Sequence, residues 1–274
     1  MILNDILIQK KKDLEELKRR FPLHRLREAC SHHPLSGLRS FQKAISGTRK
    51  LNLICEIKKA SPSEGILRED FQPLRLAGIL EYGGAAALSV LTEPHFFKGR
   101  PSYLKTIRQV TTIPILRKDF ILETYQLYES ALLEADAYLL IASILTESEL
   151  QELLRLGREL HMDALVEVHA EEDLKKAIGV GATLIGINNR DLRNLSVDPH
   201  RAKRLIPYVP KGVTIVVESG LGRREDLMEY KSMGVSAFLI GTSLMKAPEP
   251  LEKLAELFGE DRKWKKAGAS YDQG

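Results

Sequence analysis

Residues 180–191 read Val-Gly-Ala-Thr-Leu-Ile-Gly-Ile-Asn-Asn-Arg-Asp, and this stretch holds the pattern that decides the fold. Its first glycine is suited to end a helix, the apolar run Leu184-Ile-Gly-Ile follows almost at once, and polar residues come directly after the run. A second run, Thr214-Ile-Val-Val, has the same character. Runs that are apolar throughout predict parallel strands covered on both faces, and helices must supply that cover.

Eight apolar runs of this kind occur along the chain, each followed by a polar turn and a stretch with helical periodicity. Their ends recur at intervals of about 20–35 residues, the length of one βα unit. Four joints between a helix and the next strand resemble one another; glycine ends the helix after Tyr82, Val180 and Met233, and the fourth joint begins at Glu134. The predicted strands are residues 53–58, 87–90, 115–118, 137–141, 164–167, 184–188, 214–218 and 237–240.

Eight repeats of strand and helix are compatible with an open, doubly wound sheet or with a closed (β/α)8 barrel. Strands of similar short length, with no long polar break between them, favour the barrel. No Gly-x-Gly-x-x-Gly motif follows the first strand, which counts against a dinucleotide-binding sheet. We therefore predict an α/β protein with a single (β/α)8 TIM barrel in residues 49–258 and a helical extension before it.

The segment before the barrel, residues 1–48, shows helical periodicity near its start. We expect one amphipathic helix that packs on the barrel, with a lid over the site or a dimer contact as alternatives; the lysines at positions 10–12 fall outside its apolar face. Residues 259–274 carry many charges and little periodicity, so we expect a disordered tail there. The apolar positions of the helix are Leu3, Ile6, Leu7, Leu14 and Leu17.

Composition excludes several classes of protein. The 274 residues include 41 Lys and Arg against 37 Asp and Glu, and this mixed charge gives no electrostatic case for binding nucleic acid. Cys30 and Cys55 are too few for a disulfide framework, and no Cys or His pair has the spacing of zinc ligands. No signal pattern or membrane-spanning apolar run occurs. We expect a soluble, cytoplasmic protein with no metal, membrane or obligate protein partner.

Charged and polar residues end several of the predicted strands. The carboxyl ends of barrel strands meet at one mouth, where the chemistry of such folds gathers. A lone carboxylate at a strand end is more often a solvated residue or a helix cap, but here the pattern recurs on five strands. Clustered opposite charges suit general acid–base chemistry on an anionic substrate. The residues expected in this mouth are Glu56, Lys58, Lys118, Glu167, Asn188 and Glu218.

Glycine-rich loops follow the last two predicted strands. In many barrels these loops present backbone N–H groups to a phosphate, and Gly220, Gly241 and Thr242 fit that role. Ordinary βα turns also use glycine, so a simple turn remains the alternative. In the first βα loop, Ser61 is either an anion donor or part of a tight turn.

Three aromatic residues lie beyond strand ends, where they have no evident core partner. Phe96, Phe97 and Phe120 are expected either to wall a pocket for an aromatic ligand or to pack against the N-terminal helix. For His169, just past the fifth strand, we expect a surface or capping role. Cys55 has the parity opposite to Glu56 and should be a buried side chain facing the helices.

Seven segments together carry a family resemblance. They occur in the family's order, cover the chain from about residue 2 to 258, and make the chain similar to the indole-3-glycerol-phosphate synthases, barrel enzymes of tryptophan biosynthesis. The segments are Glu56-Ile-Lys-Lys-Ala-Ser-Pro-Ser-Glu-Gly, Leu91-Thr-Glu-Pro-His-Phe-Phe-Lys-Gly, Leu116-Arg-Lys-Asp-Phe-Ile, Leu165-Val-Glu-Val-His, Ile185-Gly-Ile-Asn-Asn-Arg-Asp-Leu, Val217-Glu-Ser-Gly and Gly241-Thr-Ser-Leu-Met.

The resemblance implies a reaction and a set of residue roles. The reaction is ring closure of 1-(2-carboxyphenylamino)-1-deoxyribulose 5-phosphate to indole-3-glycerol phosphate, with loss of carbon dioxide and water and without a cofactor. Lys118 matches the general acid, and Glu167 matches the acid/base residue of proton removal and dehydration. Lys58 matches a lysine that holds anionic groups of the substrate, and Glu56 orients the lysines. The other matching residues are Asn188 and Glu218 around the sugar, Arg190 near the substrate carboxylate, Ser61 in the first loop, and Ser219, Gly220, Gly241 and Thr242 around the phosphate.

The chain departs from the common family pattern at a few positions. Glu64 stands where the first loop often has lysine, Thr242 where Ser or Glu is frequent, and Asn194-Leu195 where Thr-Phe is usual. No second, fused isomerase barrel is evident, so one activity is expected. The alternatives are another phosphate-binding barrel lyase or isomerase, including an aldolase with Lys118 as a Schiff-base nucleophile, and a catalytically silent phosphate-binding barrel.

Overall fold

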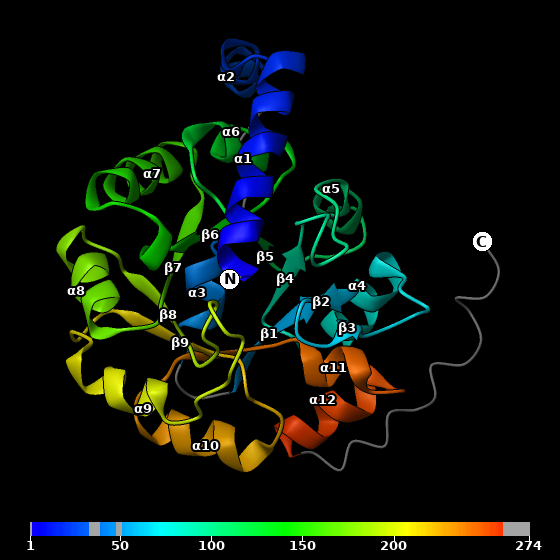
Figure 1. Ribbon diagram of the computed structural model, residues 1–274. Helices are drawn as coiled ribbons and strands as arrows, with labels where there is room; N and C mark the ends of the chain where they lie inside the picture. The colour runs from blue at the N-terminus through cyan, green and yellow to red at the C-terminus, as the bar shows by residue number, and fades with distance from the viewer. Residues whose placement is uncertain (1, 33–38, 48–50, 260–274) are drawn as a thin grey trace.

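Eight parallel strands close into a barrel in the computed structural model of the chain, which describes residues 2–32, 39–47 and 51–259 (Figure 1). Each barrel strand pairs with the next barrel strand along the chain, and β10 (Ala237–Ile240) pairs with β1 (Asn52–Ile57) to close the sheet. Closure leaves no unpaired edge in the barrel. The predicted (β/α)8 fold is confirmed.

The predicted strands are confirmed to within one residue at each end. The other barrel strands are β4 (Ala87–Leu91), β5 (Ile115–Lys118), β6 (Ala137–Ile141), β7 (Asp163–Val168), β8 (Leu184–Asn188) and β9 (Thr214–Glu218). The helices that surround them are α4 (Pro73–Tyr82), α5 (Ser102–Arg108), α6 (Thr124–Leu132), η1 (Ala142–Ile144), α7 (Glu147–Glu159), α8 (Glu171–Gly179), α9 (Arg201–Leu205), η2 (Ile206–Tyr208), α10 (Arg224–Ser232), α11 (Thr242–Lys246) and α12 (Pro250–Phe258).

The four similar joints between helix and strand share one backbone conformation. Gly84, Gly181 and Gly234 have φ values of 91°, 78° and 92°, in the left-handed region that glycine enters without steric cost. Glu134 reaches the same region, with φ 61°, although a residue with a Cβ atom pays about 1 kcal/mol there. The repeated feature is therefore the turn itself, and glycine is its commonest residue.

Two apolar layers form the core because alternate residues of each strand face opposite sides. On β1, Leu53, Cys55 and Ile57 pack in the layer between the strands and the helices, as expected for Cys55. Ile54 belongs to the second layer, which fills the barrel lumen. Glu56, two positions further along, shares this inward parity and continues the lumen toward its carboxyl end.

Three helices precede the barrel, where one was expected. They are α1 (Ile2–Arg20), α2 (Leu23–His32) and α3 (Phe41–Ile45). Pro22 separates α1 from α2, because a proline has no N–H to continue the hydrogen bonds of the first helix. The amphipathic period of the first helix gave no sign of the two that follow.

The N-terminal helices contact both ends of the barrel. Phe41 and Ile45 of α3 are fully buried in the lumenal cluster, next to the amino ends of the strands. Helix α1 crosses the opposite end, where Ile6 joins the same cluster (Figure 1). Leu17, which we placed on the buried face of α1, is 38% exposed, because α1 extends beyond the barrel there.

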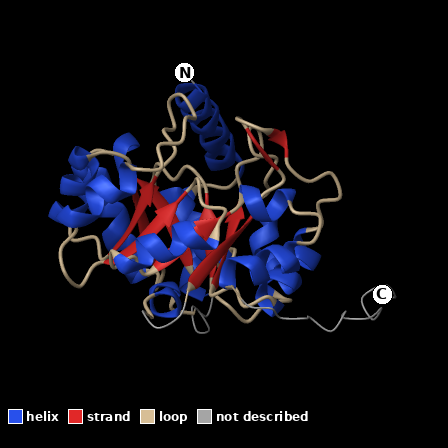
Figure 2. Cartoon of the chain, turned by 90° about the horizontal axis from the view of Figure 1, so that it is seen from below, coloured by secondary structure: helices blue, strands red, loops and turns tan. Residues whose placement is uncertain are grey.

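The first βα loop is an antiparallel hairpin, where only a turn was expected. Its strands β2 (Ala60–Ser61) and β3 (Gly65–Ile66) pair Ala60 with Ile66 and Ser61 with Gly65. Figure 2 shows this hairpin and α1 on the same side of the barrel. Two separate segments therefore stand over the carboxyl ends of the strands.

Neither a helix that is long and apolar enough to span a bilayer nor a group of three His, Cys, Asp or Glu side chains placed to hold a metal occurs in residues 2–32, 39–47 and 51–259. Both cysteines are free thiols. Burial raises the pKa of Cys30 to about 11 and that of Cys55 further, so both remain protonated and unreactive.

Candidate active site

A cavity of about 390 Å³ lies at the carboxyl ends of the barrel strands. This volume is within the range of about 300–1,000 Å³ that is usual for small-molecule sites. The structure brings together in it all six residues that were expected to share one mouth. They are Glu56, Lys58, Lys118, Glu167, Asn188 and Glu218.

Lys118 is the centre of the charged cluster. Its Nζ atom donates to Oε2 of Glu167 at 2.8 Å and to Oε2 of Glu218 at 2.6 Å. In the strand order of the barrel, β5 and β9 lie on different sides of the lumen, so Lys118 reaches across it to Glu218. One ammonium group is therefore shared by two buried carboxylates.

The protonation states of these three groups differ for physical reasons. Burial alone would lower the pKa of Lys118, but Glu167, Glu218 and Glu56 outweigh it and raise that pKa well above its usual value. Burial opposes ionisation of Glu167, yet Lys118 and His169 bring its pKa well below the usual range. Burial raises the pKa of Glu218 to about 7, since repulsion from Glu167 offsets much of the attraction of Lys118. Of the two carboxylates that share Lys118, Glu167 is thus ionised and Glu218 exchanges a proton near neutral pH.

Two glycines make room for two of the carboxylates. Lys58 forms an ion pair with Glu56 at 2.6 Å, and a methyl group at Gly241 would overlap the carboxylate of Glu56. A methyl group at Gly186 of β8 would likewise overlap Oε1 of Glu218. Gly186 was not among the predicted site residues, because a glycine within a strand has no distinctive sequence signal.

We expect Gly186→Ala to lower kcat by about tenfold by pushing the carboxylate of Glu218 aside. The free energy of unfolding should change by less than about 1 kcal/mol, since the displaced atoms are the end of a flexible side chain. Steady-state kinetics and urea unfolding measure the two effects. Gly179→Ala, where a methyl group meets nothing within 4 Å, is the control. Unchanged kcat in Gly186→Ala would contradict the prediction.

The backbone after β9 and β10 forms a concave segment suited to an anion. Ser219 and Gly220 have φ values of 66° and 73°, and Ser219 holds this conformation despite its side chain, as residues at functional sites often do. Gly241 precedes α11, which begins at Thr242, and the first N–H groups of a helix have no intrahelical acceptor. All four residues line the cavity, and β9 and β10 are neighbours, so the two loops lie together.

Aromatic side chains line the cavity on the side of β4 and β5, away from β9 and β10. The rings of Phe97 and Phe120 have centroids 6.3 Å apart. Of the two alternatives for Phe96, the structure supports packing against the N-terminal helix and not a place in the pocket wall: Phe96 is not a lining residue and packs against the apolar cluster that contains Ile6 of α1. The carboxylate of Glu93 accepts hydrogen bonds from the backbone N–H groups of both Phe96 and Phe97, at 2.7 and 3.0 Å.

The first loop is linked to two other strand ends by charged residues. Ser61, Glu64 and Arg190 all line the cavity. Arg190 donates to the carbonyl oxygen of Leu195 at 2.8 Å and lies 3.9 Å from the carboxylate of Glu64. Glu64 also pairs with Lys246. The acidic residue at this position therefore faces basic residues that follow β8 and β10.

A family profile described as indole-3-glycerol phosphate synthase matches residues 3–257. The chain belongs to the indole-3-glycerol phosphate synthase family. A relative with this name from Campylobacter jejuni (strain RM1221) is 45% identical over 258 residues, which cover 94% of this chain and all of the relative. Another, from Chlorobaculum tepidum, is 47% identical over 248 residues, which cover 90% of this chain and 96% of the relative.

Solved structures with low sequence identity share the fold of this indole-3-glycerol phosphate synthase family member. A 3-hexulose-6-phosphate synthase superposes with a TM-score of 0.61 at 13% identity, covering 76% of this chain and 99% of that one. A structure described as native KDPGal gives a TM-score of 0.53 at 16% identity, with 76% and 91% coverage. At these identities the likeness concerns the barrel alone.

The cavity contains every residue that the resemblance to indole-3-glycerol phosphate synthases assigned to the site. Those outside the charged cluster are Ser61, Arg190, Ser219, Gly220, Gly241 and Thr242. They come from separate strands, so only closure of the barrel brings them together.

His169 lies against a carboxylate of this indole-3-glycerol phosphate synthase site, where we expected a surface or capping position. Its Nε2 atom is 3.2 Å from Oε1 of Glu167, and its side chain is 12% exposed. The motif Val-Glu-Val-His contained the signal, because His169 follows Glu167 by two positions, the spacing of side chains on one face of a strand.

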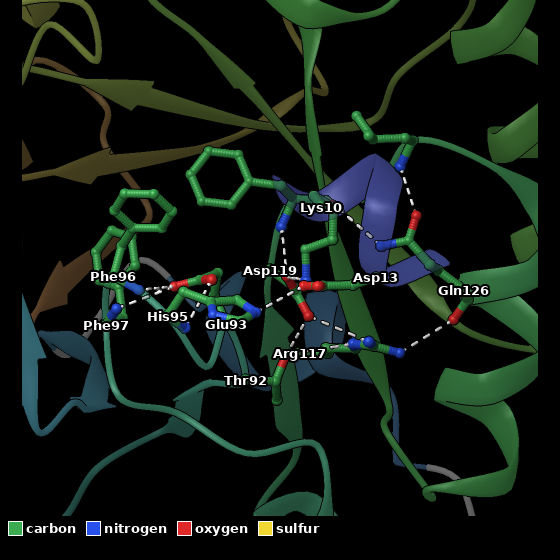
Figure 3. A network of polar contacts seen from close by, with 12 residues as sticks. Lys10, Asp13, Thr92, Glu93, His95, Phe96, Phe97, Arg117, Asp119 and Gln126 are labelled. Carbon is green, nitrogen blue, oxygen red and sulfur yellow. Dashed lines mark hydrogen bonds and ion pairs between the residues drawn. The ribbon is translucent and has the colours of Figure 1, made fainter. Parts of the chain in front are cut away.

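An ion pair that was not predicted from the sequence joins α1 to the site. Lys10, which we placed off the buried face of α1, is only 7% exposed and lies 2.6 Å from Asp119, the residue after Lys118. Asp119 also binds Arg117 at 3.1 Å and accepts a hydrogen bond from Thr92 at 2.6 Å. Figure 3 shows Lys10 pointing from α1 into this network. These contacts lower the pKa of Asp119 to about 2 despite its burial.

We expect Lys10→Met to reduce the free energy of unfolding by about 2 kcal/mol at pH 7, because Asp119 loses one of its buried partners. A group with a lowered folded-state pKa stabilises the fold above its unfolded pKa of about 3.9. The difference from wild type should therefore shrink as the pH falls from about 4 toward 2. Chemical unfolding across this range measures it, with the exposed Lys12→Met as control. An equal loss at every pH would exclude the ion pair as its cause.

Proposed function

We propose that the chain converts 1-(2-carboxyphenylamino)-1-deoxyribulose 5-phosphate to indole-3-glycerol phosphate, with release of carbon dioxide and water, in tryptophan biosynthesis. Membership of the synthase family supports this assignment. The observation that carries it is the ammonium group of Lys118, which two carboxylates share within the cavity. A binding module has no evident need for such buried charges, whose desolvation costs several kcal/mol per ion.

The cavity accommodates the two ends of this substrate in opposite places. The phosphate would bind the backbone around Ser219–Gly220 and Gly241–Thr242. The aryl ring would lie against Phe97 and Phe120. Its carboxylate would then be near the basic side chains of Lys58 and Arg190, and the reacting sugar carbons would lie between the ends, near the charged cluster.

The first step closes the ring. The ring carbon that bears the carboxylate attacks the ribulose carbonyl carbon, a carbon–carbon bond forms, and Lys118 donates a proton to the carbonyl oxygen, which becomes a hydroxyl group. Lys118 suits this role because its carboxylate neighbours keep it charged before substrate binds. Loss of carbon dioxide returns the bonding electron pair to the ring.

The second part of the reaction removes water. Glu167 would take a proton from the substrate as the carbon–oxygen bond of the new hydroxyl group breaks, and Lys58 would donate a proton to that group so that it leaves as water. Glu167 is ionised in the free protein and can therefore accept a proton. Glu56 holds Lys58, and Asn188 and Glu218 would bind the sugar hydroxyls.

The assay that tests this proposal combines the purified protein with the carboxyphenylamino substrate and follows the fluorescence of the indole product. We expect indole-3-glycerol phosphate and carbon dioxide in equal amounts. No product at any pH from about 6 to 9 would overturn it. Borohydride trapping separates the aldolase alternative: a covalent adduct on Lys118 would make that lysine a nucleophile.

The proposal includes a setting for the enzyme. We infer that it works in the cytoplasm on a small phosphorylated substrate, without nucleic acid or an obligate protein partner, and its two free thiols agree with a reducing compartment. We treat residues 49–258 as one catalytic domain and residues 1–48 as an extension packed on it. The expected tail, residues 259–274, lies outside the described residues except for Gly259.

A further inference from the structure

His169 stands directly behind Glu167 at the end of β7. His169 is the first residue after β7 and follows Glu167 by two positions, the spacing of side chains on one face of a strand. Nε2 of His169 is 3.2 Å from Oε1 of Glu167. His169 is not one of the residues that line the cavity, so it reaches the site through Glu167 alone.

The facing atoms have no other partner. Oε1 of Glu167 and both ring nitrogens of His169 are buried and make no hydrogen bond to the described residues. Nε2 and Oε1 are close enough to bond, but their alignment is poor in the free protein. Catalytic hydrogen bonds are often long or misaligned before substrate binds and tighten in the complex. Leaving both atoms unsatisfied would cost free energy, which a small ring rotation avoids.

Helix α8 fixes the backbone that carries this imidazole. The carboxylate of Asp173 in α8 accepts hydrogen bonds from the backbone N–H of His169 at 3.0 Å and of Ala170 at 3.2 Å. Asp173 thereby holds the turn between β7 and α8. The side chain of His169 is left free to turn toward Glu167.

The two oxygens of Glu167 therefore have different neighbours. Oε2 accepts from Lys118 at 2.8 Å on the cavity side, and Oε1 faces the imidazole. A carboxylate held at one oxygen only can rotate about its terminal bond, whereas one held at both keeps a single orientation. A displacement of about 1 Å in a reacting group can cost 10²-fold in rate.

We propose that His169 is a positioning residue, whose Nε2 atom donates to Oε1 of Glu167 and keeps the other oxygen aimed at Lys118 and the substrate. This inference rests on the proposed synthase function. It assigns no contact between His169 and the substrate. The imidazole acts only through the orientation of Glu167.

Two isosteric amides test this role. The side-chain nitrogen of Gln can replace Nε2 of a histidine, whereas that of Asn lies near the position of Nδ1 and cannot reach Oε1. We expect His169→Asn to lower kcat by about 10- to 100-fold with KM within about threefold of wild type. We expect His169→Gln to retain at least about a third of the wild-type kcat. Thermal unfolding of both variants gives the accompanying change in stability.

Several outcomes would overturn the inference. Wild-type kcat in His169→Asn would remove His169 from the reaction. Equal losses in the Asn and Gln variants, accompanied by equal losses of stability, would show a structural role only. In a Glu167→Gln background, His169→Asn should add little further loss, because the group that it positions is already disabled; full additivity would contradict the proposal. The synthase function is tested separately with the wild-type enzyme. Absence of product there would contradict the proposed function but not the contact between His169 and Glu167.

Discussion

Replacing Lys118 by alanine should reduce kcat by roughly 10²- to 10⁴-fold, the usual contribution of a general acid. KM should stay within about threefold, because the proposed phosphate and aryl contacts do not involve Lys118. The physical reason is that, within residues 2–32, 39–47 and 51–259, no other ammonium group forms ion pairs with both Glu167 and Glu218. Steady-state turnover, followed by indole fluorescence, measures the loss.

The variant Lys118→Arg distinguishes a role of Lys118 as proton donor from a role of its positive charge alone. Arginine keeps the positive charge between the carboxylates but does not release a proton under working conditions. An acid role therefore predicts a loss in Lys118→Arg that approaches that of Lys118→Ala. Near-normal turnover in the arginine variant would assign Lys118 an electrostatic role, and near-normal turnover in both would remove it from the mechanism. Lys105→Ala, at an exposed position, is the control for activity that is lost during preparation of a variant.

The second large effect is expected for Glu167→Gln, with kcat again lower by roughly 10²- to 10⁴-fold. Glutamine has nearly the size of glutamate and still accepts a hydrogen bond from Lys118, but it cannot take up a proton. The fold should survive, since the substitution removes a buried charge without opening a cavity. Binding of the product, measured by calorimetry, should change by less than about threefold.

The matched control for this carboxylate is Glu172→Gln on the exposed face of α8, which should keep wild-type kinetics. A Glu167→Gln enzyme that turns over at the wild-type rate would assign proton removal to another group. Glu218 would then be the first candidate, because its pKa of about 7 suits proton exchange. Loss of product binding together with kcat would instead indicate that Glu167 binds the substrate.

Strand positions could be predicted because a strand that is buried on both faces is apolar along its own length. The run at residues 184–188 is apolar almost throughout, and the strand β8 has these bounds. The end of α1 could not be placed in the same way, because the break at Pro22 lies between two stretches that are both helical. A local pattern indicates that a helix is present more reliably than it indicates where that helix ends.

The charged residues of the site could be predicted because the alternation of side chains along a strand and the point where a strand ends can both be read from a short stretch of sequence. Glu56 and Lys58, two positions apart, enter the same cavity for this reason. Phe96 and Phe97 are residues of the same type in the same loop, yet only Phe97 lines the cavity. Both rings also pack against the apolar cluster that contains Ile6 of α1, and both backbone N–H groups donate to Glu93, so the direction of each ring is decided only in the folded loop.

Lys10 marks the limit of pattern analysis most clearly. On α1 it falls at a polar position, and polarity alone predicts exposure. Its partner Asp119 lies 109 positions further along the chain. A buried lysine is stable only with such a partner, so its burial is a property of the pair and not of the helix.

By itself, the sequence determined the positions of the strands along the chain, the inward parity of the charged residues and the family to which they point, since each depends on short-range periodicity or on ordered motifs. The tertiary structure alone decided which charges meet: Lys118 between Glu167 and Glu218, Lys10 on Asp119, and His169 against Glu167. The reason is barrel closure. Interaction energies between ions and the pKa values that follow depend on distances of a few ångströms, and those distances exist only once distant strands share one lumen.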